Sequence, residues 1–327
     1  MSKPLTVSVE EIHKLFFAPA DLGALYVEYG DYIQKTPGIT WGVTSIDKYV
    51  IPIRPGQLCY IVARPGHGKS TTAAYLAKKT ALEIKAAGKQ DKECVVYISL
   101  DQPVEEIYAM LQSDADTNLT DYAWGRVSHE RMIQKKRESV DVPLWAIGRS
   151  VMQRSAPRLT FENIYRGLEV MEAHYKIRPV LAIIDYIQIV PVGKGQDRAT
   201  QVSEAVIRAR ELAAQLGAPM LILAQAGRQV DSYDDKIPGL ADCQHSSAIE
   251  QDADKVFGIW RPCLTESEKF LDVRIGGAEK QIEITKNLFV MGLRKQRMGD
   301  PKHTFYCSLD PSLVRLSDLE LENESPS

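Results

Sequence analysis

The sequence lacks any long apolar run and any excess of charge of one sign. No stretch approaches the roughly 18 consecutive apolar residues that a membrane span needs, and the N-terminal segment MSKPLTVSVEEIHKLFF lacks the continuous apolar core of a signal peptide. The 40 Lys and Arg residues nearly balance 43 Asp and Glu residues, which gives a net charge of -3. Any surface that binds nucleic acid must therefore be local. We expect a soluble, cytoplasmic protein with no membrane partner.

Cysteine is scarce, and its spacing argues against a disulfide framework. The chain contains five cysteines, none of them in a CxxC pair: Cys59, Cys94, Cys243, Cys263 and Cys307. Three lie in apolar, strand-like runs, so we expect buried, reduced thiols rather than disulfide bonds or a metal site. This pattern agrees with a cytoplasmic location.

Apolar, strand-like runs alternate with helical periodicity along most of the chain. The predicted strands are 58–63, 94–100, 143–148, 180–186, 220–226, 255–260, 289–293 and 303–309. Several show no polar alternation, which is typical of strands covered on both faces. Helices are predicted at 160–176, with Thr160 as the N-cap, and at 200–217, closed by a glycine. The pattern predicts an α/β fold with a mainly parallel central sheet flanked by helices.

The chain divides into an arm, a main domain and a tail. Residues 1–37 contain two short amphipathic segments, VEEIHKLFF and LGALYVEYGDYIQK, with Pro19 breaking between them, and are too short to form a core. Residues 38–316 are the predicted main domain, in which 270–284 has the pattern of a surface β-hairpin. Residues 317–327 are acidic and polar, and we expect them to be disordered.

The segment ARPGHGKS (63–70) has the pattern and the context of a phosphate-binding loop, because it follows an apolar strand and precedes a helix. The pattern asks for Gly at Ala63, but that position needs only a tight turn. The predicted nucleotide contacts are Arg64, Pro65, Gly66, His67, Gly68, Lys69, Ser70 and Thr71. Lys69 would contact the terminal phosphates of ATP, and Ser70 would hold Mg²⁺. The alternative is a glycine-rich turn between a strand and a helix.

Three polar residues end neighbouring apolar runs and are candidates for the hydrolysis of ATP. Asp185 ends VLAIID, which we expect to be a strand next to the phosphate loop, and would position Mg²⁺; the alternative is an Asp that merely ends a buried strand. Asp101 follows CVVYISL and would orient the attacking water; the alternative is the N-cap of the helix VEEIYAML. Gln225 ends MLILAQ and would sense the γ-phosphate; the alternative is a Gln bonded to nearby backbone.

Further motifs accompany the loop. The chain contains, in this order, SLD, IIDYIQIV, LILAQAGRQVD, SSAIEQDADKVFGIWR and GLRKQRMGD. In order and approximate spacing they resemble the motifs of the DnaB-type replicative helicases, over roughly residues 38 to 310. The resemblance implies a RecA-like P-loop ATPase that uses ATP and Mg²⁺. It also implies a homo-hexameric ring with single-stranded DNA through its centre, and movement in the 5′ to 3′ direction.

In that family, basic residues from the neighbouring subunit complete the ATP site. The matching positions here are Lys295 and Arg297 of the RKQR run. A cation delivered across an interface stabilises charge on the transferring phosphoryl group and couples hydrolysis to subunit movement. The alternative is a solvated basic end of a strand.

The chain departs from the family pattern in its arm and at Asp101. We expect the chain to lack the family's large N-terminal primase-interacting domain, and by resemblance the arm is a linker helix that docks on the neighbouring subunit. Family members usually have Glu where this chain has Asp101. Asp is one methylene shorter, so the attacking water would be poorly placed and turnover would be slow.

The loop that contacts DNA in the family is neutral here. The matching positions are about Gln244, His245 and Ser247, with no Arg among them. Such a loop can donate hydrogen bonds to phosphates but releases fewer counterions, so we expect weaker binding. Arg228 or the basic run ERMIQKKRE could compensate, although that run is also typical of a solvated helix face.

The leading hypothesis is an ATP-driven motor on single-stranded DNA that unwinds duplex by strand exclusion. Its further partner would be a helicase loader or another replication or mobile-element protein. A second hypothesis is a ring ATPase for partner remodelling or loading with weak or no DNA binding. A third is a nucleotide-stabilised scaffold that has lost hydrolysis. DNA-stimulated ATPase activity, ATPase activity indifferent to DNA, and nucleotide binding without turnover distinguish the three.

Overall fold

The structure is a computed structural model that describes residues 13, 16–36, 38–153, 155, 157–189, 197–243, 251–275 and 277–320. The chain separates into two compact units, residues 1–38 and 39–327. The predicted first helix of the arm and the end of the acidic tail lie almost wholly outside the described residues. None of the helices in the described part of the chain is both long and apolar enough to cross a lipid bilayer.

In the described residues of the first unit, the long helix is α2 (Pro19–Lys35). Pro19, predicted as a break between two helices, is the first residue of α2, since the first helical position needs no N–H donor. No residue of α2 is buried. Its exposed large apolar side chains are Leu22, Leu25, Tyr26, Val27, Tyr29 and Tyr32. A helix with this much exposed apolar surface is suited to a partner surface.

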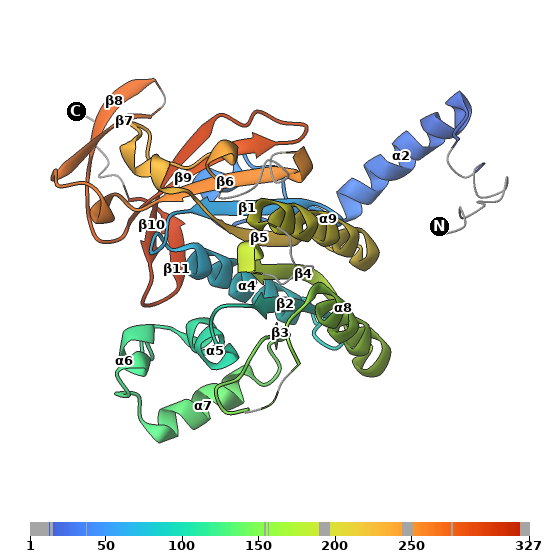
Figure 1. Cartoon of the computed structure of the whole chain (residues 1–327), viewed down its shortest axis with the longest axis horizontal. Coiled ribbons are helices and arrows are strands. Elements are labelled where there is room, and N and C mark those ends of the chain that lie inside the picture. Colours follow the sequence, from blue (N-terminus) through green and yellow to red (C-terminus); the bar gives the residue numbers. More distant parts are fainter. Residues whose placement is uncertain are drawn as a thin grey trace. The chain divides into compact units, whose positions relative to one another are not determined.

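The second unit is built on a nine-stranded sheet with the order β11-β10-β9-β6-β1-β5-β4-β2-β3 (Figure 1). The parallel strands are β1 (Leu58–Ala63), β2 (Glu93–Ser99), β3 (Leu144–Ile147), β4 (Arg178–Asp185), β5 (Met220–Gln225) and β6 (Lys255–Trp260). The antiparallel strands are β9 (Leu288–Gln296), β10 (His303–Asp310) and β11 (Arg315–Asp318). The predicted α/β fold with a mainly parallel sheet is confirmed.

Near the C-terminus, the structure agrees with one prediction, the hairpin, and differs from another, the start of the tail. The predicted hairpin is present as β7 (Phe270–Ile275) paired with β8 (Ala278–Glu283). Strand β11 extends past the predicted start of the disordered tail, because both carboxylate oxygens of Asp318 accept hydrogen bonds from the N–H groups of Thr44 and Ser45.

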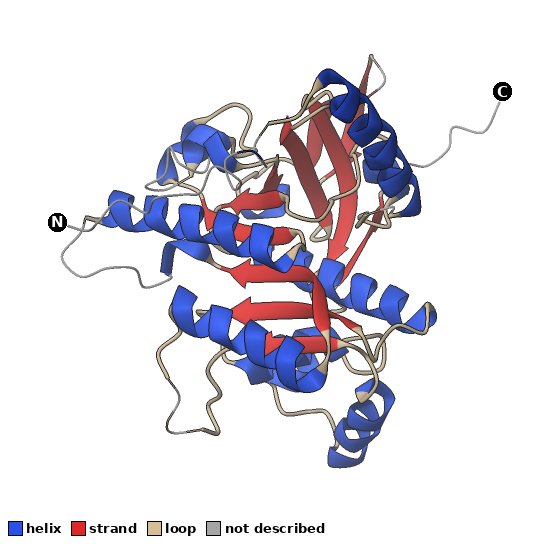
Figure 2. Cartoon of the chain, turned by 90° about the vertical axis from the view of Figure 1, so that its right-hand side faces the viewer, coloured by secondary structure: helices blue, strands red, loops and turns tan. Residues whose placement is uncertain are grey.

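Helices cover both faces of the sheet (Figure 2). The helices described in this unit are α3 (Thr44–Asp47), α4 (Lys69–Ala86), α5 (Val104–Gln112), α6 (Leu119–Ala123), α7 (His129–Ser139), α8 (Phe161–Val170) and α9 (Arg198–Leu216), of which α6 and α7 bury no residue. Thr160 caps α8 as predicted, by accepting a hydrogen bond from the N–H of Asn163. Helix α9 begins earlier than the predicted Thr200, because Asp197 accepts hydrogen bonds from both the N–H and the hydroxyl of Thr200.

Side chains of the central strands alternate between two cores. In β1, Ile61 packs in the core that α4 covers, whereas Tyr60 packs in the core that α8 and α9 cover. Strand β4 repeats the pattern with Ile183 and Ala182. Both faces are buried, which explains why these strands appear in the sequence as continuous apolar runs rather than alternating ones.

A buried carboxylate ties three elements together at the amino end of the parallel strands. Asp254 accepts hydrogen bonds from the N–H of Leu58, at 2.9 Å, and from Nη1 of Arg210, at 2.8 Å. Its second oxygen lies 3.2 Å from Nη1 of Arg297. The side chain of Asp254 is 4% exposed. It therefore joins the start of β1, helix α9 and the end of β9.

Replacing Asp254 by Ala should lower the free energy of unfolding by about 3 to 5 kcal/mol, because the partly buried guanidinium of Arg210 loses its counter-ion. Urea denaturation with and without the change measures this. The matched control is Glu162→Ala, which removes a carboxylate from an exposed pair with Arg166 and should have little effect. Equal effects of the two changes would contradict a stabilising role for Asp254.

Candidate nucleotide-binding site

Parallel pairing brings the predicted site residues to one edge of the sheet. Ala63, the last residue of β1, is in register with Gln225, the last residue of β5. Ser99, the last residue of β2, is in register with Asp185, the last residue of β4. From the sequence, Asp185 is predicted to lie on a strand next to the phosphate loop. That expectation is wrong, because β5 lies between β1 and β4.

The loop between β1 and α4 has the backbone of a phosphate-binding turn. Gly66 and Gly68 have φ of 80° and 93°, values that favour glycine. A Cβ at Gly68 would also lie 2.9 Å from Cδ2 of Leu309. Helix α4 begins at Lys69, and the first N–H groups of a helix have no acceptor within it. These groups and the helix dipole are suited to bind an anion.

Lys69 is placed at the base of the loop. Its Nζ lies 3.4 Å from the carbonyl oxygen of Ala63. Burial lowers the pKa of Lys69, the carboxylate of Asp185 opposes this shift, and the nearby guanidinium of Arg64 adds to it. A triphosphate would supply negative charge where the ammonium has lost part of its hydration.

The two residues predicted to hold Mg²⁺ are in contact. The side chain of Ser70 is hydrogen-bonded to Asp185, and the hydroxyl of Tyr97 donates to Oδ2 of Asp185 at 2.7 Å. Burial raises the pKa of Asp185, and these hydrogen bonds together with Lys69 oppose that shift. A hydroxyl and a carboxylate are oxygen ligands that Mg²⁺ accepts beside phosphate oxygens and water. These residues therefore fit the ion that the sequence predicts.

Tyr97 is a site residue that the sequence analysis missed. It is fully buried in β2, and burial together with the neighbouring carboxylate of Asp185 raises its pKa. A phenol inside an otherwise apolar strand is the signal that could have found it, because a buried hydroxyl needs a partner. Tyr97 stays protonated and holds the carboxylate in place.

Asp101 and Gln225 lie at the same edge. Asp101 is exposed just beyond β2, and its charge raises the pKa of both Lys69 and Asp185. The N-cap residue of α5 is Pro103, so the alternative interpretation of Asp101 as that cap is wrong. The side-chain amide of Gln188 forms two hydrogen bonds with the main chain of Gln225: its Nε2 donates to the carbonyl oxygen, and its Oε1 accepts from the N–H, both at 3.2 Å. Gln188 was not predicted from the sequence.

Two side chains of the loop are engaged by the protein itself. Arg64 donates from Nε to Asp231 at 3.0 Å and from Nη1 to the carbonyl of Ala226 at 3.2 Å. His67 is buried, and its Nδ1 accepts a hydrogen bond from the N–H of Arg261 at 3.1 Å. Burial lowers the pKa of His67 to about 4, so the imidazole is neutral at pH 7. His67 thus anchors the loop to the end of β6.

Lys295 and Arg297 lie at the opposite edge of the sheet from the loop. Lys295 pairs with Val256 near the start of β6, and β6 runs parallel to β1. The length of β1, roughly 20 Å at about 3.3 Å per residue, separates this edge from the loop. The side chain of Arg297 is 61% exposed beside Asp254. One chain therefore does not bring these cations to its own loop.

The residues predicted to contact DNA are only partly described. Arg228 is exposed at the start of the short helix η3 (Arg228–Ser232), whereas Gln244, His245 and Ser247 lie outside the described residues. In α7, which contains the whole basic run ERMIQKKRE, Arg131 pairs with Asp116 at 3.2 Å and Lys135 pairs with Asp114. Part of that positive charge is thus neutralised within the chain.

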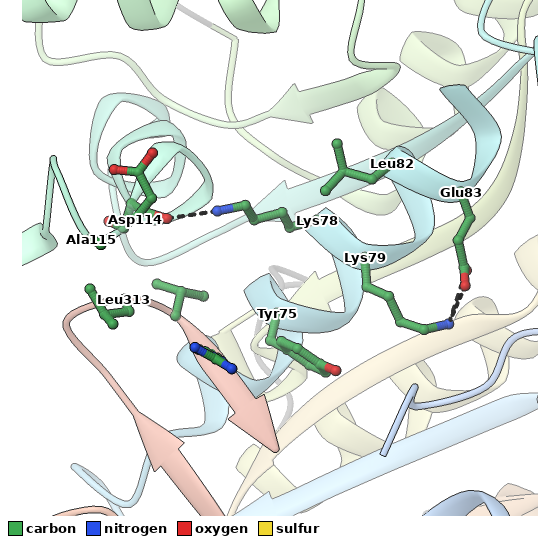
Figure 3. A pocket seen from close by; sticks show the side chains of 11 residues that line it. Tyr75, Lys78, Lys79, Leu82, Glu83, Asp114, Ala115 and Leu313 are labelled. Carbon is green, nitrogen blue, oxygen red and sulfur yellow. Dashed lines mark hydrogen bonds and ion pairs between the residues drawn. The ribbon is translucent and has the colours of Figure 1, made fainter. Parts of the chain in front are cut away.

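A separate cavity of about 500 Å³ lies along α4 (Figure 3). Within it, Lys78 donates to the carbonyl of Ser113 at 2.6 Å, and Lys79 pairs with Glu83 at 2.8 Å. Neither the predicted nucleotide contacts nor Arg228 line this cavity.

Comparisons with known proteins agree with the motifs. The DnaB-like helicase C terminal domain model matches residues 38–309. The replicative DNA helicase DnaB of Buchnera aphidicola subsp. Schizaphis graminum is 28% identical over 267 residues, 79% of this chain and 50% of that protein. DnaB of Leifsonia xyli subsp. xyli is 30% identical over 236 residues, 71% of this chain and 48% of that protein. The chain thus spans about half the length of these relatives.

Solved structures show the same fold. A DnaB-like replicative helicase, described with its interactions with primase, superposes with a TM-score of 0.72 at 21% identity, over 97% of this chain and 72% of that chain. A second solved structure, of an ATPase domain, superposes with a TM-score of 0.71 at 21% identity, over 93% of this chain and 100% of that domain. The central sheet is thus the RecA-like sheet predicted from the motifs, and the chain belongs to the DnaB-like helicase C-terminal domain family.

Proposed function

We propose that this chain is an ATP-dependent motor on single-stranded DNA that unwinds duplex by strand exclusion as a homo-hexameric ring. The observation that carries the proposal is the division of the site between two edges of one sheet. Lys69, Ser70 and Asp185 gather at the carboxyl edge, while Lys295 and Arg297 lie at the amino edge. Family membership supports an ATPase with this arrangement.

Each residue at the carboxyl edge has a separate role in hydrolysis. The loop amides and Lys69 bind the β- and γ-phosphates, while Ser70 and Asp185 would hold Mg²⁺, which neutralises charge on the phosphate oxygens. Asp101 orients the attacking water and accepts its proton. Gln225, whose main chain is hydrogen-bonded to the side-chain amide of Gln188, senses the γ-phosphate.

Cations at the amino edge act on the site of the next protomer. A head-to-tail interface, in which one surface meets a different surface of the next copy, closes into a ring when the rotation allows. In this interface Lys295 and Arg297 approach the phosphates bound by the neighbour, and α2 lays its apolar side chains on a neighbouring subunit. By family resemblance the ring moves 5′ to 3′, and a loader or another replication or mobile-element protein places it on DNA.

A second candidate is a ring ATPase for partner remodelling or loading with weak or no DNA binding. The ion pairs that neutralise Arg131 and Lys135 favour it, because they reduce the cationic surface available to DNA phosphates. The neutral residues Gln244, His245 and Ser247 favour it as well.

ATPase assays with and without single-stranded DNA, combined with unwinding of a forked duplex, distinguish the two candidates. The proposed motor should hydrolyse ATP faster with DNA and should open the fork. ATPase activity that does not respond to DNA, together with an intact fork, would support the second candidate instead.

Mixing two inactive variants tests the shared site. Lys69→Ala should abolish hydrolysis because the phosphates lose their cation, and Arg297→Ala should retain nucleotide binding but lose turnover by about 10³-fold or more. Mixed rings contain some boundaries with an intact Lys69 facing an intact Arg297. Steady-state ATPase activity should therefore reappear on mixing, and a mixture as inactive as its components would sink the shared-site arrangement.

Asp101→Glu should raise the hydrolysis rate by about tenfold or more, because the longer side chain moves the carboxylate toward the attacking water. Single-turnover hydrolysis measures the chemical step directly. Asp101→Asn, which keeps the length and removes the base, is the matched control and should be slower than the natural protein. An unchanged rate in both variants would show that Asp101 does not orient water.

A further inference from the structure

Arg64 reaches out of the phosphate loop to a different segment of the chain. Its guanidinium contacts both carboxylate oxygens of Asp231, at 3.0 and 3.2 Å, and the carbonyl of Ala226. The side chain of Arg64 is 19% exposed and that of Asp231 is 48% exposed. An ion pair this accessible adds little to folding stability. The pair nevertheless connects two separate segments, because Arg64 belongs to the phosphate loop and Asp231 to the segment that follows β5.

The segment that Arg64 contacts is closed on itself. Ala226 forms an antiparallel bridge with Cys243, and the N–H of Gly227 donates to the carbonyl of Asp242 at 2.8 Å. Val230, in the middle of η3, is 1% exposed and anchors the segment in the core. The chain thus leaves β5 at Ala226 and returns to the same place at Cys243. The next residues are those predicted to contact DNA.

Asp231 acts electrostatically on the phosphate loop. Its charge raises the pKa of His67 against the larger, opposite effect of burial. A bound triphosphate would attract Arg64 and repel Asp231, so the pair has a different energy with and without nucleotide. Only such a differential interaction allows a ligand to shift the position of a distant segment. The Arg64 and Asp231 pair meets this condition.

We propose that Asp231 is a positioning residue that acts through Arg64 and couples the phosphate loop to residues 226–243, which directly precede the predicted DNA contacts in the sequence. The carbonyl of Ala226 and the carboxylate of Asp231 are the points at which a displacement of Arg64 is transmitted to residues 226–243. The inference rests on the proposed function, because it requires that the chain binds single-stranded DNA.

The test measures coupling in both directions in the full chain. The affinity for a fluorescent oligo-dT strand is measured with and without a non-hydrolysable ATP analogue, and the affinity for a fluorescent ATP analogue with and without oligo-dT. Coupling is reciprocal, so both ratios must agree. Asp231→Asn should reduce the coupling ratio by about fivefold or more, a loss within the usual range of allosteric coupling. Asp231→Glu, which keeps the charge, should retain most of it.

Two comparisons make the result decisive. Asp234→Asn removes an exposed carboxylate from the same segment and should leave the coupling ratio unchanged. In the double variant Arg64→Gln with Asp231→Asn, the loss should equal that of Arg64→Gln alone, because Asp231 acts only through Arg64. Additive losses, or full coupling in Asp231→Asn, would overturn the inference while leaving the motor proposal intact. Failure of the natural protein to bind oligo-dT would overturn both.

Discussion

The constraint on which the rest of this structure depends is the common direction of six neighbouring strands. Parallel strands end at the same edge of the sheet. Polar residues that follow the apolar runs therefore lie close together there, although they are far apart in the sequence. Asp185 and Gln225 come together with the loop in this way. The same rule sends the start of every strand to the other edge, where Asp254 joins β1 to α9 and β9.

Because the two edges lie a strand length apart, a single chain does not bring all of the predicted site residues together. The antiparallel return of β9 carries Lys295 and Arg297 to the amino edge, a full strand length from the phosphate loop. Arg297 is paired there with Asp254, so its charge is compensated in the single chain while its side chain stays accessible. In the proposed ring, the neighbouring subunit would supply these cations to the phosphates. Hydrolysis would then be linked to the relative position of the subunits.

The site also concentrates polar groups that burial makes unfavourable. Lys69 and Asp185 are both shifted toward their neutral forms by burial, and each opposes the shift of the other. Tyr97 and Ser70 supply the hydrogen bonds that Asp185 needs in this position. Binding of a triphosphate with its metal ion adds charges that favour both ionised forms. Burial of Lys69 and Asp185 is thus unfavourable in the absence of nucleotide, but the same two residues provide the affinity for nucleotide and metal ion.

The sequence by itself determined the strands, the phosphate loop and the family, because apolar runs and the spacing of GKS, IDYIQ and RKQR are local features. It did not determine that β5 separates β1 from β4, nor the partners of Arg64, His67 and Gln225, which come from residues distant in the chain. Those pairings depend on strand order and on how loops return to the sheet. Only the tertiary structure decided them, since long-range contacts leave no periodic pattern in the sequence.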